Sequence, residues 1–293
     1  TRFETGKDYP IYARKKGSLN AKEEILFDCN ELAKGQSYFQ LGGLSISPDN
    51  KLALFSTDVV GRRIYTMQVK NLETGKLLAD KIENVDGNGV WANDNKTFFY
   101  VTQDKKTLRS DKVYRHQIGT ADKKDPLVFE EKDDTFNVGI GKEKSKKYIV
   151  IQSGSTLTTE YQTLLTDNPL GEFKVFQPRI RGLEYSISHY GDHFYILTNK
   201  DKATNFKVMK TPENATSKDN WKDLIPHRKD VLVEDIEIFK DYLVVSERQN
   251  GLSKIRIMPW SGKDEYYLPF EIETYTANTT TNVDFDTDIL RYG

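Results

Sequence analysis

The chain is short of several residues and patterns on which common protein classes depend. It has a single cysteine, Cys29, so it cannot form an internal disulfide, which is typical of a protein in a reducing compartment. Its 43 Lys and Arg nearly balance its 44 Asp and Glu, and the net charge of −1 produces no field that would attract nucleic acid or an anionic membrane. No apolar run approaches the ~18 residues of a transmembrane helix. We therefore expect no nucleic-acid partner, no membrane partner, and a cytoplasmic or periplasmic location.

Catalytic motifs are missing as well. The nearest approach to the hydrolase motif G-x-S-x-G is Gly43–Ser47, but it lacks the second glycine and lies within a predicted strand. His189 and His193 are four residues apart, as metal ligands on a helix can be, but they fall on either side of a predicted turn between strands. Cys29 has no second cysteine or histidine nearby. We predict no catalytic residue, no metal ligand and no cofactor site in this chain.

What the chain does contain is a repeating unit of about 45–50 residues. The segment 45–51 (SISPDNK) is echoed 45 residues later by 90–96 (VWANDNK), and in each case an apolar strand follows. Weaker echoes begin at 138, 185, 235 and 284. A period of this length that is filled with strands is typical of a β-propeller, with one four-stranded blade per repeat.

The repeat predicts an all-β fold and a single domain over residues 1–293. The clearest unit has predicted strands at 44–47, 52–57, 63–69 and 76–79, and four more units follow near 85–131, 132–181, 182–228 and 229–280. The alternating segment 63–69 (RIYTMQV) is typical of a strand with two unlike faces. We expect the innermost strands to include 45–47, 90–92, 138–140, 186–188 and 235–238 and to line one axial channel. Helix is sparse, with a short turn expected around 217–221.

The two ends of the sequence predict incomplete blades. Strands are expected at 9–14 and 24–28, and residues 284–293 begin another blade that stops after about one hairpin. Five complete blades and a partial blade at each end predict a seven-bladed propeller of four-stranded antiparallel blades, with the first and last blades truncated. The open strand edges near 1–10 and 285–293 predict strand-mediated self-association or poor order.

Several segments resemble one family from end to end. They are 1–12 (TRFETGKDYPIY), 61–65 (GRRIY), 107–116 (TLRSDKVYRH), 130–136 (EEKDDTF), 184–190 (EYSISHY) and 290–293 (LRYG). These segments are similar to oligopeptidase B, the trypsin-like branch of the prolyl oligopeptidase family of serine peptidases.

The resemblance implies that a seven-bladed propeller precedes an α/β-hydrolase domain that holds the catalytic Ser, Asp and His. It further implies cleavage of short peptides after Arg or Lys, with the acidic residues that bind this side chain in the hydrolase domain. Because the matching segments end at Gly293, within the last blade, none of these functional residues lies in this chain. The expected partners are therefore the hydrolase domain of the same polypeptide and, for the whole enzyme, short basic peptides. This chain would be the non-catalytic propeller that caps the active site and excludes large substrates.

Five residues stand out as candidates for an interdomain or gating role: Arg115, Glu130, Glu131, Asp133 and Asp134. They lie in the most family-like segments, on a framework that does not otherwise need such specific residues. Salt bridges that only tie adjacent strands together are an equally good interpretation. Two other functions remain open: a free-standing propeller that presents loops to protein partners, and a propeller enzyme of the lactonase or glycosidase type with acidic residues or a metal on its axis.

Overall fold

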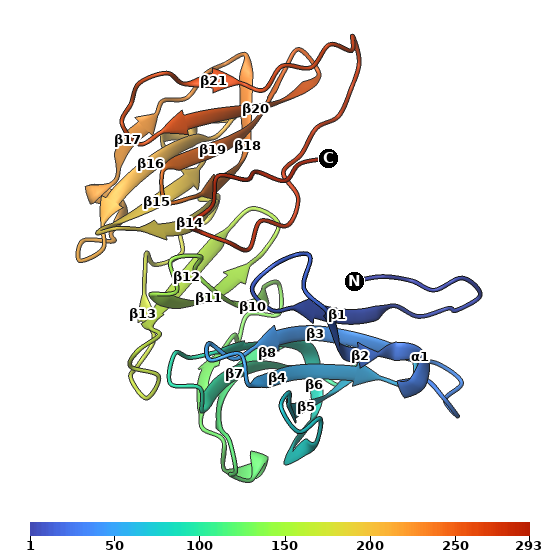
Figure 1. The fold of residues 1–293 in the computed structure, drawn as a ribbon. Helices are drawn as coiled ribbons and strands as arrows, with labels where there is room; N and C mark the ends of the chain where they lie inside the picture. Colours follow the sequence, from blue (N-terminus) through green and yellow to red (C-terminus); the bar gives the residue numbers. More distant parts are fainter. The chain divides into compact units, whose positions relative to one another are not determined.

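The computed structural model describes residues 1–293, and nearly all of its regular structure is antiparallel β-strand (Figure 1). The helical segments are short: α1 (Cys29–Leu32), η1 (Asp122–Lys124), η2 (Lys200–Lys202) and η3 (Lys218–Asn220). The last of these confirms the turn predicted around 217–221. No helix is both long enough and apolar enough to cross a membrane.

Two compact units make up the chain. The first comprises residues 1–141 and 167–169, and the second comprises residues 142–166 and 170–293. Strand β10 (Asn137–Lys142) runs through the boundary between them. The single domain expected from the sequence stays a prediction.

The first unit begins with a two-stranded sheet. Strand β1 (Ile11–Lys15) pairs with β2 (Glu23–Asp28) in antiparallel register, which confirms the two N-terminal strands predicted from the sequence. Helix α1 follows β2 directly because the Asp28 carboxylate accepts hydrogen bonds from the backbone N–H groups of Asn30 and Glu31.

A seven-stranded meander forms the rest of this unit (Figure 1). Its strands, in both spatial and chain order, are β3 (Gln40–Ile46), β4 (Leu52–Asp58), β5 (Tyr65–Asn71), β6 (Leu77–Trp91), β7 (Thr97–Gln103), β8 (Ser110–Gln117) and β9 (Leu127–Glu130). The sequence predicted two four-stranded units here, and the pairing contains both: residues 77–85 of β6 pair with β5 and residues 85–91 pair with β7. The two units are joined into one sheet. The last strand of one unit continues as the first strand of the next, because Asn84 and Gly87 adopt positive φ values of 63° and 108° and let β6 bend without ending.

The turns that revealed the repeat have the same local structure in both copies. Asn50 and Asn95 have φ values of 62° and 60°, and the preceding Asp side chains accept the backbone N–H groups of Lys51 and Lys96. The two copies also contact each other: the Asn95 side chain accepts the N–H of Asp49, a sequence separation of 46. In the second unit, the N–H of His189 donates to Glu143, which is again 46 residues away. Hydrogen bonds at the repeat distance show that equivalent positions of neighbouring repeats lie side by side.

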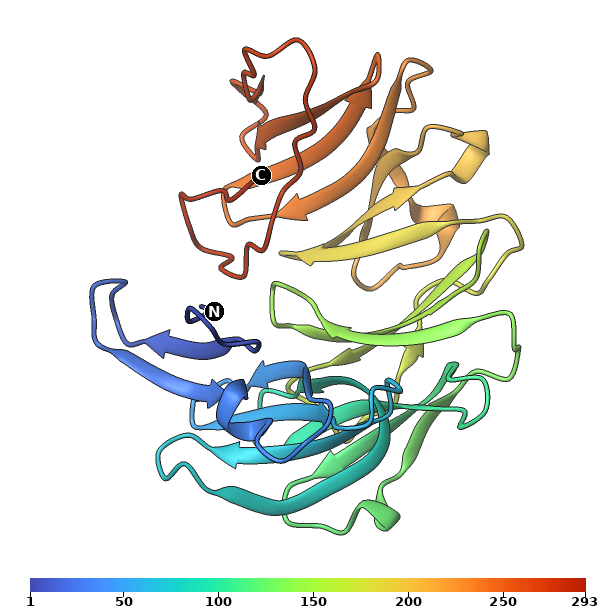
Figure 2. The ribbon, with the colours of Figure 1, turned by 90° about the vertical axis from the view of Figure 1, so that its right-hand side faces the viewer.

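The second unit contains two complete four-stranded meanders (Figure 2). The first is formed by β14 (Tyr185–Tyr190), β15 (His193–Thr198), β16 (Lys207–Pro212) and β17 (Lys222–Ile225). The second is formed by β18 (Val231–Ile238), β19 (Tyr242–Gln249), β20 (Leu252–Pro259) and β21 (Tyr266–Tyr267). Strands β11 (Tyr148–Gly154), β12 (Thr159–Leu165) and β13 (Lys174–Val175) precede them. These sheets confirm the units predicted near 182–228 and 229–280.

Apolar side chains between neighbouring sheets form the cores. In the first unit the cluster includes Leu54, Met67, Trp91 and Phe98, while Phe27 of β2 packs against Phe55 on the opposite face of the meander. In the second unit, one cluster joins β14–β17 to β18–β21 and includes Leu197, Val233 and Val245. Burying these aliphatic and aromatic side chains contributes about 1.5–3 kcal/mol each before entropy costs are counted, so packing between the sheets dominates the stability of the fold.

The predicted innermost segments lie in or overlap β3, β6, β10, β14 and β18, each of which begins a predicted unit. The axial channel that they would line stays a prediction. The hairpin predicted near the C-terminus is reduced to one isolated bridge between Thr279 and Tyr292, and residues 284–293 form no strand. Self-association through strand edges also stays a prediction.

Candidate functional site

The predicted acidic residues lie in the loop that follows β9. Glu130 is exposed and 3.6 Å from the Lys112 ammonium group, and Asp134 is also exposed. Glu131 is buried, and its carboxylate accepts the backbone N–H of Asp133. The Asp133 carboxylate in turn accepts the N–H and the hydroxyl of Thr135, so the loop has a defined shape.

Arg109 holds this acidic loop in place, a role that the sequence did not reveal. Its guanidinium group donates to the backbone oxygens of Glu131, Asp133 and Phe136 at 3.0–3.4 Å. These bonds fix the path of the loop backbone. Arg109 is part of the family-like segment 107–116, but a sequence pattern does not distinguish an arginine that binds carbonyls from one that is solvated.

Arg115 lies at a different place from the acidic loop. It is opposite Phe99 in the middle of the β7–β8 pair, whereas the acidic loop follows Glu130, which pairs with Lys112 near the start of β8. The Arg115 guanidinium donates to the backbone oxygen of Pro169 at 3.1 Å. The structure therefore separates the predicted residues into two candidate sites, Arg115 with the 167–169 segment and the acidic loop with Arg109.

Three further loops lie at the same end of the seven-stranded sheet as the acidic loop. Asp58 ends β4 and Tyr65 begins β5, so loop 58–64 is at this end. The Ser56 hydroxyl donates to the carbonyl oxygen of Gly87, which connects this loop to the bend in β6. Asp86 in the same bend accepts the Ser110 hydroxyl at 3.3 Å, beside loop 104–109. One end of the sheet thus carries four loops. The pKa of Asp86 at this end is raised because burial disfavours the ionised form of its carboxyl group.

A buried polar cluster lies inside the first unit. The side chain of His116 is fully buried, and its Nε2 is 2.9 Å from Asp80 while its Nδ1 is 2.9 Å from Asp125. The Tyr100 hydroxyl donates to Asp125 as well. Burial alone would lower the pKa of His116, but the two carboxylates outweigh this effect and raise it. The side chains of His116, Asp80 and Asp125 are at most 3% exposed, so we interpret the cluster as structural.

The other histidines belong to separate networks. His189 is buried, with Nδ1 at 2.9 Å from the Ser145 hydroxyl and Nε2 at 3.1 Å from Glu213, which also accepts from Lys147 and Tyr148. His193 binds the adjacent Asp192 instead. Burial lowers the pKa of His189 and raises the pKa of Glu143, which accepts the His189 backbone N–H, to about 7. The i, i+4 histidines therefore do not share a ligand position.

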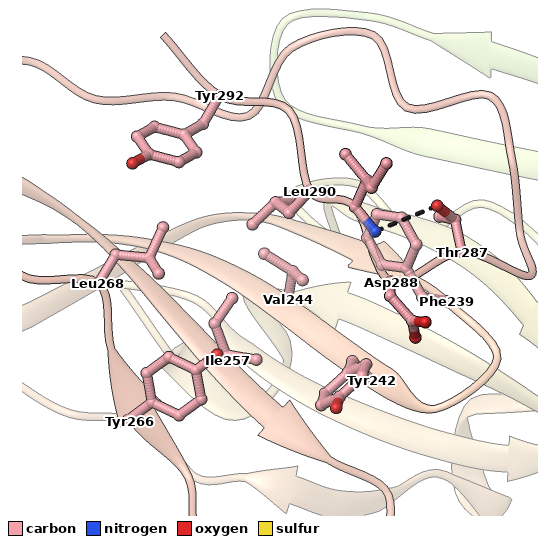
Figure 3. Close-up of a pocket in the computed structure, with 11 residues that line it drawn as sticks. Phe239, Tyr242, Val244, Ile257, Tyr266, Leu268, Thr287, Asp288, Leu290 and Tyr292 are labelled. Atoms are coloured by element: carbon pink, nitrogen blue, oxygen red, sulfur yellow. Dashed lines mark hydrogen bonds between the residues drawn. The ribbon is translucent and has the colours of Figure 1, made fainter.

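A cavity of about 270 Å³ opens on sheet β18–β21 in the second unit (Figure 3). Strands β19 and β20 contribute Tyr242, Val244 and Ile257, and the segment 287–292 closes the other side. The hydroxyl of Thr287 accepts the backbone N–H of Ile289 within this segment. The walls are apolar and aromatic with a single carboxylate, Asp288, so the cavity could hold an apolar side chain but has no nucleophile and base.

The Ser145 hydroxyl contacts His189, but the His189 side chain is 2% exposed and packs against the rings of Tyr148 and Phe194, so we interpret this contact as structural. Ser45 lies within β3, where its carbonyl oxygen accepts the Trp91 indole N–H, and no histidine contacts its hydroxyl. Cys29 is buried, and burial raises the pKa of its thiol to about 11, which disfavours the reactive thiolate. No group of three or more His, Cys, Asp or Glu side chains is arranged to hold a metal ion.

Comparison with known proteins agrees with this β-meander framework. Residues 1–293 match the family described as the N-terminal β-propeller domain of prolyl oligopeptidase. The chain is 40% identical to dipeptidyl aminopeptidase BI of Pseudoxanthomonas mexicana over 99% of its length, and 31% identical to Protease 2 of Moraxella lacunata over 98%. Among solved structures, oligopeptidase B from Leishmania major matches 98% of the chain with a TM-score of 0.89 and 29% identity. Oligopeptidase B from Trypanosoma brucei, in a closed form with covalently bound antipain, gives a TM-score of 0.89 and 30% identity.

The chain therefore belongs to the N-terminal propeller domains of the prolyl oligopeptidase family, as the resemblance to oligopeptidase B predicted. It spans 42% of the length of each of the two curated relatives and 42% of each of the two oligopeptidase B structures.

Proposed function

We propose that this chain is the non-catalytic propeller of a serine peptidase and that it caps the active site of an α/β-hydrolase domain in the same polypeptide. The observation that carries the proposal is the family match over residues 1–293, combined with relatives in which this region is only 42% of the length. In the complete protein the blades would number seven, and their ring would admit short peptides and exclude folded proteins.

For the substrate, we propose short peptides cleaved after Arg or Lys. Support comes from the matches to Protease 2 and to oligopeptidase B, which cover almost the whole chain. A second specificity has a specific observation in its favour: the 40% identity to a protein named dipeptidyl aminopeptidase exceeds the 31% identity to Protease 2. Release of dipeptides from the amino terminus is therefore the competing activity.

We assign Arg115 and the acidic residues Glu130, Glu131, Asp133 and Asp134 to contacts that position the propeller against the hydrolase domain. Glu130 and Asp134 are exposed on a loop whose path Arg109 fixes through carbonyl groups, which supports their contact with a basic surface. Arg115 would act from a separate place, through the 167–169 segment that its guanidinium contacts.

The test uses the full-length protein and the isolated 293-residue chain. A fluorophosphonate probe should label the full-length protein and leave the isolated chain unlabelled. Internally quenched peptides with one Arg or Lys should be cleaved after that residue, and cleavage should stop when the same site is placed in a folded domain. Release of dipeptides from an unblocked amino terminus, without cleavage of blocked peptides, would favour the competing activity. Labelling of the isolated chain would overturn the non-catalytic assignment.

A further inference from the structure

A second cavity in the second unit has walls that carry mostly positive charge. It has a volume of about 420 Å³ and lies between residues 180–183, which precede β14, and loop 199–206, which joins β15 to β16. Its charged lining residues are Arg181, Lys200, Asp201, Lys202 and Lys218. Four cationic groups and one carboxylate give this lining a net charge of +3, whereas the whole chain has a net charge of −1. Positive charge is therefore concentrated at this cavity.

Hydrogen bonds hold the two walls of this cavity together. The Asn199 side chain accepts the backbone N–H of Glu184 and donates to the carbonyl oxygen of Gly182, both at 3.0 Å. The Thr198 hydroxyl donates to the carbonyl oxygen of Glu184 at 2.8 Å. Because these bonds join the chain before β14 to the chain after β15, the two segments that carry the charged residues have a fixed relative position. A ligand that binds between them loses little of the chain's conformational entropy.

The one carboxylate of the lining is already paired with cations. The Asp201 carboxylate accepts hydrogen bonds from the ammonium groups of Lys200 at 2.9 Å and of Lys207 at 3.1 Å. Asp201 and Lys202 are consecutive and have φ values of 58° and 62°, a backbone conformation that is costly for residues with side chains. These ion pairs help to maintain the strained part of loop 199–206. Since two cations surround one carboxylate, this group keeps a positive charge and does not repel an anion.

The remaining cationic side chains have no structural partner of consequence. Arg181 and Lys202 are both exposed, and neither side chain forms an ion pair or a hydrogen bond within the chain. Lys218 binds the neighbouring Asp219, but the two side chains are 37% and 80% exposed, and such a pair adds little to stability. Structural ion pairs therefore do not account for these three cations at one cavity.

We propose that this cavity binds a small anion that carries a phosphate group, held by Arg181, Lys202 and Lys218. A guanidinium group matches two phosphate oxygens in a bidentate geometry, and lysine ammonium groups add point charges around them. The lining charge of +3 matches the nearly two negative charges of a phosphate monoester more closely than the single charge of a carboxylate. Ile180 is 40% exposed and adds apolar lining that the organic part of an ester can cover. This proposal concerns the second unit alone and does not depend on the proposed function.

The test measures the binding of inorganic phosphate and of phenyl phosphate to the full-length protein by isothermal titration calorimetry. R181E/K202E reverses the two charges that have no partner. The control is K174E/K263E, which makes the same change in net charge at two exposed lysines of the second unit that have no ion pair and do not line the cavity. R181Q/K202Q removes the charges without reversing them. Melting temperatures without ligand show whether each variant is folded, and R181Q/K202Q provides the comparison if R181E/K202E is not.

We expect R181E/K202E to weaken binding by about tenfold or more, because it replaces two attractive charges with repulsive ones. R181Q/K202Q should weaken binding by a smaller factor, and K174E/K263E should bind as the wild type does to within about twofold. Each probe should also raise the melting temperature of the wild type more than sodium chloride does at the same ionic strength, since a ligand that binds only the folded state stabilises it.

The two probes distinguish the sources of the phosphate group. Tighter binding of phenyl phosphate assigns the cavity to a phosphate ester, and equal binding of both probes assigns it to free phosphate. A wild type that binds neither probe would overturn the proposal, as would an equal loss of binding in R181E/K202E and K174E/K263E. Neither result affects the proposed function, which the serine probe and the peptides test separately.

Discussion

His116 is the buried residue whose chemistry is most constrained by its neighbours. Both ring nitrogens lie 2.9 Å from carboxyl oxygens of Asp80 and Asp125, an arrangement that favours the imidazolium form and raises the pKa of His116. The groups around it are Asp80, Asp125, the Tyr100 hydroxyl and the Phe98 ring. One positive charge thus offsets two buried negative charges where β6, β8 and the loop before β9 meet.

Replacing His116 should therefore be costly and should change the pH dependence of stability. The pKa of His116 is raised in the folded chain, so protonation of His116 stabilises the fold. This stabilisation is complete below the unfolded pKa of about 6.5 and is lost as the pH rises through the folded pKa. His116→Ala leaves two buried carboxylates without their partner and should cost about 3–5 kcal/mol near pH 6. Urea unfolding from pH 5.5 to 9 measures this, and a variant with unchanged pH dependence would show that the imidazolium is not the cause.

Glu143 makes a second residue-level prediction in the other unit. Burial raises its pKa to about 7, so the folded chain retains a proton that the unfolded chain releases near 4.5. The stabilisation that comes from the raised pKa of Glu143 is complete below about pH 4.5 and is lost as the pH rises towards 7. Glu143→Gln keeps the acceptor for the His189 N–H without the charge, so it should stabilise the chain at pH 8 and change little at pH 5. Melting temperatures at the two pH values test this, and equal effects at both would contradict it.

At the scale of the element, close backbone approach at the bend of β6 shapes the loop end of the first unit. A Cβ on Gly43 of β3 would lie 2.3 Å from the Gly87 carbonyl oxygen, far inside contact distance. Gly87 itself has a φ of 108°, which permits the bend. The bend lets one strand serve two neighbouring repeats and places loops 58–64 and 104–109 at one end of the sheet.

Gly43→Ala should consequently destabilise the chain by about 1–3 kcal/mol through overpacking. The matched control is Gly139→Ala in β10, where a Cβ would meet nothing within 4 Å and φ is not positive. That control should be neutral or should stabilise by a few tenths of a kcal/mol, because alanine restricts the unfolded chain. Chemical denaturation measures the free energy of unfolding of both variants. Equal effects would mean that β3 can move away from the bend.

At the scale of the whole molecule, the candidate residues should affect the enzyme more than the propeller. Arg115 is half-buried and donates a hydrogen bond to the Pro169 carbonyl oxygen, and the net contribution of such a bond to stability is only about 0.5–1.5 kcal/mol. Arg115→Ala should therefore change peptide turnover by the full-length enzyme while the unfolding free energy of the 293-residue chain stays within about 1 kcal/mol. Unchanged turnover would leave Arg115 with a structural role alone.

The repeat, the all-β class and the strand order could all be predicted from the sequence, because each depends on local patterns. These patterns each extend over only a few residues, and the structure retains them. They are the alternating side chains of segments such as 65–69, the Asp-Asn turns at fixed spacing, and the lack of helical periodicity. The family could be recognised for the same reason, since its segments are short and continuous. The continuous β6 was missed because its bend depends on Gly87 and Gly43 lying against each other.

The candidate sites depended on tertiary structure. The sequence singled out Arg115 and the acidic residues together, but only the register of β8 with β7 and β9 shows that they lie apart. Nothing local distinguishes Arg109, which binds three carbonyl groups across a loop, from Arg62, which has no partner in the chain. Sequence patterns determined which strands form, since propensity and alternation are local properties. Tertiary structure decided which charged side chains are already satisfied and which remain available for binding, because that depends on contacts between residues distant in the chain.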